Sequence, residues 1–285
     1  MWLNKDPFDL STFISGLSYS IPLVLFLGVH EFGHYFAARI HRIKTTLPYF
    51  IPIPPFILNP FGTMGAIIKI KGPIQSKKEL LDIGIAGPLA GFVIALIIYL
   101  YGLFTLPSID YLYIIHPEYK LIQSIPSTGL TFGSSILIYL TRFLFPTNHF
   151  FPPMNEIYHY PFLCVGWFGF FITSLNLIPI GQLDGGHILY ALIGKKQGII
   201  ARIFFIVIII IGLTSFLPGK IFPLETGTIG WLVFAFILFF IIKLTHPPIL
   251  DETPLDYKRK TLGWIAVLIF IISFVPTPLY ELTQK

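Results

Sequence analysis

Long apolar runs with almost no charge are the feature that most limits what this sequence can fold into. A helix needs about 20 apolar residues to cross the hydrocarbon core of a bilayer. Only 12% of the 285 residues are charged, and a charge near the bilayer centre costs several kcal/mol. These properties exclude a soluble fold. The sequence predicts an all-α polytopic membrane protein with about six transmembrane helices, at residues 12–40, 80–104, 160–179, 199–217, 228–244 and 262–276.

Three segments depart from this simple helical pattern. The third predicted helix breaks at Pro179 and restarts after Gly186, because proline removes a helix donor and glycine has a low helix propensity. Residues 62–71 end in an alternating, β-branched run, which favours a strand. A small membrane-embedded β-hairpin or strand is therefore expected, covered by protein or facing a water cavity. Residues 130–145 are apolar but short, so they are expected to form an interfacial or re-entrant helix.

The basic residues indicate how the chain is oriented in the membrane. The formal net charge is +5, and most of the 19 Lys and Arg residues lie in groups between predicted helices. Such groups act as topology signals and contact the headgroups of a lipid bilayer, so no nucleic-acid partner is expected. With about six crossings these groups face one side, which the positive-inside rule identifies as the cytoplasm. Both termini are then extracytoplasmic, and a prokaryotic cell (inner) membrane is the expected location.

The sequence His30-Glu31-Phe32-Gly33-His34 is the clearest chemical signal, and it follows an apolar run. Residues four apart on a helix share a face, so His30 and His34 can bind one metal ion. Glu31 lies beside them and can take a proton from a metal-activated water. Ionisable side chains are costly inside a membrane, so a purely structural polar cluster is the weaker interpretation.

A catalytic zinc ion has three protein ligands and one open position, so a third ligand is needed. Asp184 is the first candidate, because the break around Pro179 turns it toward the bundle interior. Alternatively, Asp184 caps the helix that follows, as Asp before Gly often does. His187 is the other candidate ligand, although a supporting or surface position suits it better.

Two motifs together resemble those of the site-2 protease family, the zinc intramembrane metalloproteases. They are His-Glu-x-x-His at residues 30–34 and Asn-x-x-Pro followed by Asp-Gly-Gly at residues 176–186. The resemblance implies one Zn²⁺ per chain and an opening of the active site toward the cytoplasm. The metal ligands that it implies are His30, His34 and Asp184, and the catalytic acid–base that it implies is Glu31.

The resemblance also implies residues that contact the substrate or support the site. These are Asn176, Pro179, Gly185, Gly186, Gly62, Thr63, Met64 and Gly65. A substrate helix must unwind before it is cut, and in lipid each freed backbone N–H and C=O needs a partner. An exposed strand edge at residues 62–71 can supply such partners by β-augmentation. The alternative is an ordinary hairpin packed against the bundle.

The chain is similar to a minimal form of the family, without an inserted PDZ domain or a trailing nucleotide-sensing CBS domain. A single transmembrane metalloprotease domain is expected over residues 1–285, with a catalytic core at about 12–217 and additional helices at about 226–278. The implied activity is hydrolysis of peptide bonds within or near transmembrane segments. The implied substrate is a single-pass membrane protein already trimmed by another protease.

Two other functions fit parts of the sequence. A divalent-metal carrier could use the same His and Asp residues to pass Zn²⁺ across the membrane, but it gives no reason for Glu31 to stand beside His30. A structural membrane protein with a degenerate site is the other alternative. The remaining histidines, including His116 and His159, are expected to be solvent-facing or interfacial residues.

Overall fold

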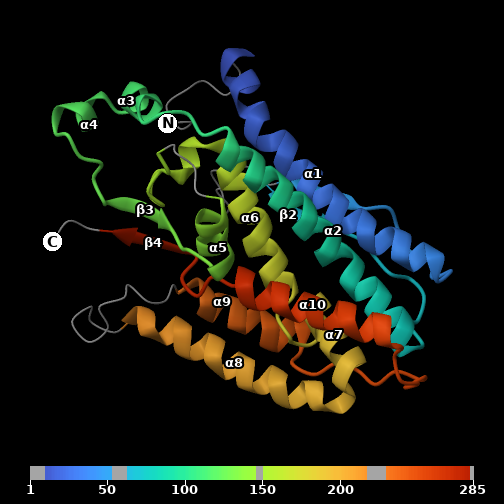
Figure 1. Cartoon of the computed structure of the whole chain (residues 1–285). Helices are drawn as coiled ribbons and strands as arrows, with labels where there is room; N and C mark the ends of the chain where they lie inside the picture. Colours follow the sequence, from blue (N-terminus) through green and yellow to red (C-terminus); the bar gives the residue numbers. More distant parts are fainter. Residues whose placement is uncertain (1–9, 53–62, 146–149, 217–228, 283–285) are drawn as a thin grey trace.

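The computed structural model describes residues 10–52, 63–145, 150–216 and 229–282, and this part of the chain is mostly helical (Figure 1). The helices are α1 (Leu10–Ile40), α2 (Lys77–Phe104), α3 (Asp110–Ile115), α4 (Pro117–Leu121), α5 (Ile136–Leu144), α6 (Pro161–Asn176), α7 (Asp184–Ile193), α8 (Gln197–Leu213), α9 (Gly230–Ile237) and α10 (Tyr257–Ser273). The strands are β1 (Tyr49–Pro52), β2 (Thr63–Ile67), β3 (Gly129–Phe132) and β4 (Leu279–Leu282). Short 3-10 turns cover Ile157–His159, Gly194–Lys196 and Thr214–Phe216, and a π turn covers Leu238–Ile242.

The predicted class, a mostly helical membrane protein with a small strand element, is confirmed in its coarse form. Within the described residues, three helical runs are long and apolar enough to cross a membrane, namely Ile14–Ile40, Lys77–Phe104 and Asp184–Phe216. Pro161–Asn176 and Gly230–Ile242 are shorter apolar helices. The helix predicted at residues 199–217 corresponds to α8, which follows α7 after a turn at Gly194 with a φ of +62°. The count of about six crossings stays a prediction.

The main core lies where α1, α2 and α6 pack together. Phe26 on α1, Tyr99 on α2 and Trp167 on α6 are almost completely buried there. The indole Nε1 of Trp167 donates to the Gly133 carbonyl oxygen at 2.6 Å, which satisfies its one polar group. By contrast, α8 exposes a row of isoleucines that lipid can cover: Ile199, Ile203, Ile206 and Ile210.

Two small antiparallel sheets accompany the helices in the part of the chain that the structure describes. Strands β1 and β2 form the hairpin expected after the first helix, with Tyr49 opposite Ile67. In the second sheet Gly129 lies opposite Leu282, so β3 pairs with a strand close to the C-terminal end of the chain. The interfacial helix predicted at residues 130–145 is wrong for its first residues, which form β3, while α5 follows. The partner strand lies far away in the sequence, so no local pattern indicates this pairing.

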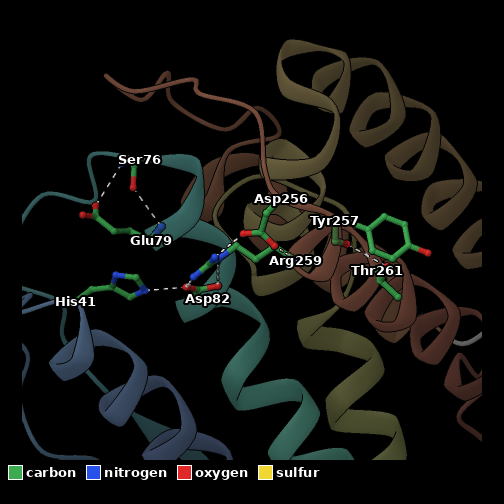
Figure 2. Close-up of polar contacts among 8 residues, drawn as sticks. All are labelled: His41, Ser76, Glu79, Asp82, Asp256, Tyr257, Arg259 and Thr261. Carbon is green, nitrogen blue, oxygen red and sulfur yellow. Dashed lines mark hydrogen bonds and ion pairs between the residues drawn. The ribbon is translucent and has the colours of Figure 1, made fainter.

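Asp82 on α2 connects three helices at one end of the bundle (Figure 2). Its carboxylate lies 2.9 Å from Nε2 of His41, directly after α1. Arg259 on α10 donates to the same carboxylate through Nε at 2.9 Å and Nη2 at 2.8 Å. Nearby, Ser76 and Glu79 form a capping box that fixes the start of α2. These contacts hold the ends of α1, α2 and α10 in register.

Replacing Asp82 with asparagine is expected to destabilise the protein, because His41 and Arg259 both lose a charged acceptor. Loss of hydrogen bonds to a charged group lowers the free energy of unfolding by about 1–3 kcal/mol. Thermal unfolding in detergent micelles should show a midpoint lower by a few degrees. Asp110→Asn, at an exposed position in α3, is the matched control and should unfold like the parent. Equal midpoints for the two variants would contradict a linking role for Asp82.

Candidate metal centre and active site

Helix α1 presents the His-Glu-x-x-His motif to α2 at a very close approach. A side chain on Gly33 would lie 2.5 Å from the Ala86 carbonyl oxygen, so the two backbones nearly touch. Gly87 leaves the space that the imidazole of His34 occupies, and a Cβ on Gly91 would lie 2.9 Å from His30 Nδ1. Gly87 and Gly91 thus form a small-residue packing face on α2, and both buried histidines depend on it.

The break between α6 and α7 brings Asp184 to these histidines. Helix α6 ends at Asn176, and the chain turns through Gly181, whose φ of +54° favours glycine. Helix α7 begins at Asp184, and Oδ2 lies 3.2 Å from His34 Nε2 and 3.7 Å from His30 Nε2. The N-cap position is Leu183 and no side chain caps this helix. The carboxylate therefore faces the imidazoles and does not act as a cap.

The three side chains are suited to bind a zinc ion. The Nε2 atoms of His30 and His34 lie 3.3 Å apart. Ligand atoms of a tetrahedral zinc site stand about 3.3–3.4 Å from one another, given Zn–N and Zn–O bonds near 2.0–2.1 Å. His34 Nδ1 lies 2.7 Å from the Ile83 carbonyl oxygen, an acceptor that fixes Nδ1 as the protonated nitrogen and leaves Nε2 free for the metal. His30, His34 and Asp184 could therefore bind one metal ion and leave a fourth position open.

His187, the alternative ligand, lines the same cavity but is not one of the three grouped ligands. Its Nδ1 lies 2.8 Å from Nε2 of His246, which follows the π turn after α9. Gly84 on α2 packs against α7, where an added Cβ would lie 3.1 Å from the Cβ of His187. The pairing of His187 with His246 could not be predicted, because 59 positions separate the two residues.

Asn176 is the supporting residue that lies closest to the centre. Its amide Nδ2 lies 3.1 Å from His30 Nε2. The Pro179 carbonyl oxygen accepts a hydrogen bond from Gln197 at 3.2 Å. Gly185 and Gly186 lie directly against backbone carbonyls of the turn before α7, where a side chain would clash. These last three positions therefore shape the α6–α7 turn.

The strand positions predicted to contact substrate are only partly described. Thr63, Met64 and Gly65 lie in β2, and Gly65 has a φ of +99°. Gly62 lies outside the described residues. A cavity of ≈ 220 Å³ joins the strand region to the metal-binding group. Its lining includes His30, Glu31, His34, Asn176, Asp184, Ala66, Ile68 and Ile70. Ala66, Ile68 and Ile70, in and after β2, thus border the same space as Glu31.

Comparison with known proteins agrees with this geometry. Residues 18–217 match the family model described as Peptidase family M50. The chain belongs to this family. The predicted resemblance to site-2 proteases is thereby confirmed, and the matched segment contains His30, His34 and Asp184, the group that could bind a metal ion.

Curated relatives of this M50 chain have names that agree with a metal-dependent enzyme. It is 29% identical to "Probable zinc metalloprotease EGY2, chloroplastic" of Arabidopsis thaliana, over 95% of this chain and 43% of that protein. It is 34% identical to "Probable zinc metalloprotease EGY1, chloroplastic" of Oryza sativa subsp. japonica, over 58% of this chain and 26% of that protein. The chain spans less than half the length of these relatives.

Proposed function

We propose that this chain is an intramembrane zinc metalloendopeptidase that hydrolyses peptide bonds within or near transmembrane segments. The observation that carries the proposal is the convergence of His30, His34 and Asp184 with Glu31 on one cavity. Two of the three ligands and Glu31 lie on α1, a helix long and apolar enough to cross a membrane. Membership of a peptidase family supports the same reaction.

In this reaction some side chains bind the metal ion and another transfers protons. Zinc, when bound by the two imidazoles and the Asp184 carboxylate, supplies a Lewis acid that activates water and polarises the scissile carbonyl. Glu31 accepts the proton of the attacking water and returns it to the leaving amine. Asn176, near the open side of His30, can donate to the carbonyl oxygen on which charge develops.

We propose that the substrate is a single-pass membrane protein already shortened by another protease. The cavity is small, and Ala66, Ile68 and Ile70 border it, so the strand region can bind an unwound segment by main-chain hydrogen bonds. A large extramembrane domain on the substrate would hinder entry between the helices.

The proposed orientation places the opening of the site toward the cytoplasm. Lys77, Lys78 and Arg259 lie at the end of the bundle where α2 begins, which is also the end nearer the metal-binding group. Both chain ends, residues 1–9 and 283–285, lie outside the described residues. The prokaryotic membrane stays a prediction, whereas the two relatives named above are described as chloroplastic.

The alternative of a metal carrier is not favoured. The chain belongs to a peptidase family, and Glu31 borders the cavity without being one of the three grouped ligands. A carrier would move zinc into a sealed vesicle, whereas a protease would cleave a peptide in its membrane. One reconstituted system can therefore distinguish the two functions.

The test uses purified protein in proteoliposomes with a panel of single-pass peptides. Each transmembrane sequence is offered with a long or a short extramembrane domain. We expect the short form to be cleaved about tenfold faster or more, equivalent to at least ~1.4 kcal/mol in activation free energy. A chelator should stop cleavage, and zinc should restore it. Zinc uptake without cleavage of any peptide would instead support the carrier, and equal cleavage of both forms would reject only the need for trimming.

A further inference from the structure

We propose that His116, Glu156 and His159 form a second metal site, which takes a zinc-type divalent ion and is separate from the protease centre. This group of potential ligands has two buried members, Glu156 and His159, and one partly buried member, His116. It lies on the link between α2 and α6. Along α2 alone, Gly91 beside His30 and Phe104 at the helix end are about 20 Å apart. The proposal does not depend on the proposed protease function.

The distances among the three side chains match those expected of a metal site. Nε2 of His116 lies 3.1 Å from Nε2 of His159. Oε2 of Glu156 lies 3.4 Å from His159 Nε2 and 3.8 Å from His116 Nε2. The corresponding distances in the protease centre are 3.3, 3.2 and 3.7 Å. Both sets bracket the separation of about 3.3–3.4 Å between ligands of a tetrahedral zinc ion.

One atom of the group has no hydrogen-bond partner. Glu156 is only 3% exposed, and its Oε2, which faces the two imidazoles, accepts no hydrogen bond among the described residues. The other oxygen, Oε1, accepts from the Tyr119 hydroxyl at 2.9 Å and from Asn155 Nδ2 at 3.3 Å. A buried carboxylate oxygen without a partner is costly. A cation between Oε2 and the two ring nitrogens would satisfy all three atoms together.

The neighbouring contacts orient His116 for metal binding. Its Nδ1 lies 2.9 Å from Oε1 of Glu118, so Nδ1 carries the proton and Nε2 presents a lone pair to the group. The His116 ring also stacks on Tyr119, with centroids 4.6 Å apart. His34 in the protease centre is arranged in the same manner, with its Nδ1 on a carbonyl oxygen and its Nε2 toward the ligand group.

The chemistry of the ligands favours zinc, with a structural role. Two imidazoles and one carboxylate are typical zinc ligands, and water can complete the tetrahedron. The ion would join His116, at the start of α4, to the 3-10 turn immediately before α6. It would thereby fasten the link between α2 and α6 to the bundle (Figure 1). The sequence predicts that His116 and His159 are solvent-facing or interfacial residues, whereas the structure buries His159 and brings it to His116 across 43 positions.

The test counts metal ions in the purified full-length chain. Wild type and three variants, His34→Asn, His159→Asn and the double variant, are saturated with zinc, dialysed and analysed by mass spectrometry. We expect about two zinc ions in wild type, about one in each single variant and none in the double variant. His41→Asn, whose imidazole pairs with Asp82 outside both groups, serves as the matched control and should keep both ions.

A thermal shift measurement tests the proposal even if the His159→Asn variant does not fold. Zinc should raise the unfolding midpoint of His34→Asn, because a ligand bound only to the folded state stabilises it. Glu156→Gln in the same background should abolish that rise. No zinc in His34→Asn and no zinc-dependent shift would overturn the proposal, and so would a shift that persists when Glu156 is replaced.

Discussion

Replacing Glu31 with glutamine is expected to lower peptide cleavage about 10²–10⁴-fold, the usual contribution of a positioned acid–base residue. Glutamine keeps the size of the side chain but cannot accept the proton of the attacking water. Zinc content should stay at the parent level, because the ligand group contains His30, His34 and Asp184 without Glu31. The measurements are cleavage of a reconstituted transmembrane peptide and metal analysis of the same sample.

The control for this variant is Glu281→Gln, at an exposed position on β4. It makes the same chemical change away from the cavity and should cleave at the parent rate. A Glu31→Gln protein that binds zinc and cleaves like the parent would remove the proposed acid–base role. Loss of both zinc and cleavage would instead assign Glu31 to the structure of the metal centre.

Replacing Gly87 with alanine is expected to weaken zinc binding about 10–100-fold or more, with a matching loss of activity at limiting zinc. The new methyl group would occupy the position of the His34 imidazole, so either the ligand or the α2 backbone must shift. The change is otherwise favourable to a helix, since alanine has a higher helix propensity than glycine by about 1 kcal/mol. Zinc titration of the purified apo protein measures the effect.

Gly28→Ala is the matched control for this second variant. It lies on α1 near the motif, but its new Cβ would meet only Phe50 Cζ at an ordinary 3.6 Å. We expect parent-like zinc affinity for it. Unchanged affinity in Gly87→Ala would show that α2 moves aside at little cost, which would argue against a preformed ligand geometry.

The parts of the fold and site that could be predicted have local signals. The spacing of His30 and His34 on a helix is a four-residue pattern, and the break at Pro179 is visible in the sequence before α7 begins. Long apolar runs likewise indicate helices. The existence of the hairpin followed from the β-branched run after Gly62, whereas its register depends on a bulge between Phe50 and Pro52.

The remaining features depend on contacts between distant segments. Asp82 is one carboxylate among many in the sequence, and nothing near it indicates that Arg259 will be its partner. The same is true of β3 with β4, and of His116 with His159. The spacing of apolar residues in the sequence indicates which face of a helix or strand is apolar, but it does not indicate which other element packs against that face. Three-dimensional packing is needed to find these pairs.

The position of Asp184 as the first residue of α7 has an electrostatic consequence. Aligned peptide dipoles give the amino end of a helix a partial positive charge, which stabilises a carboxylate placed there. The anion thus has a favourable partner in the main chain even before any cation arrives. Because α7 is a regular ten-residue helix, Asp184–Ile193, this charge belongs to a helix and not to a loop. The ligand geometry is consequently set by the backbone, so the apo protein can receive its metal with little rearrangement.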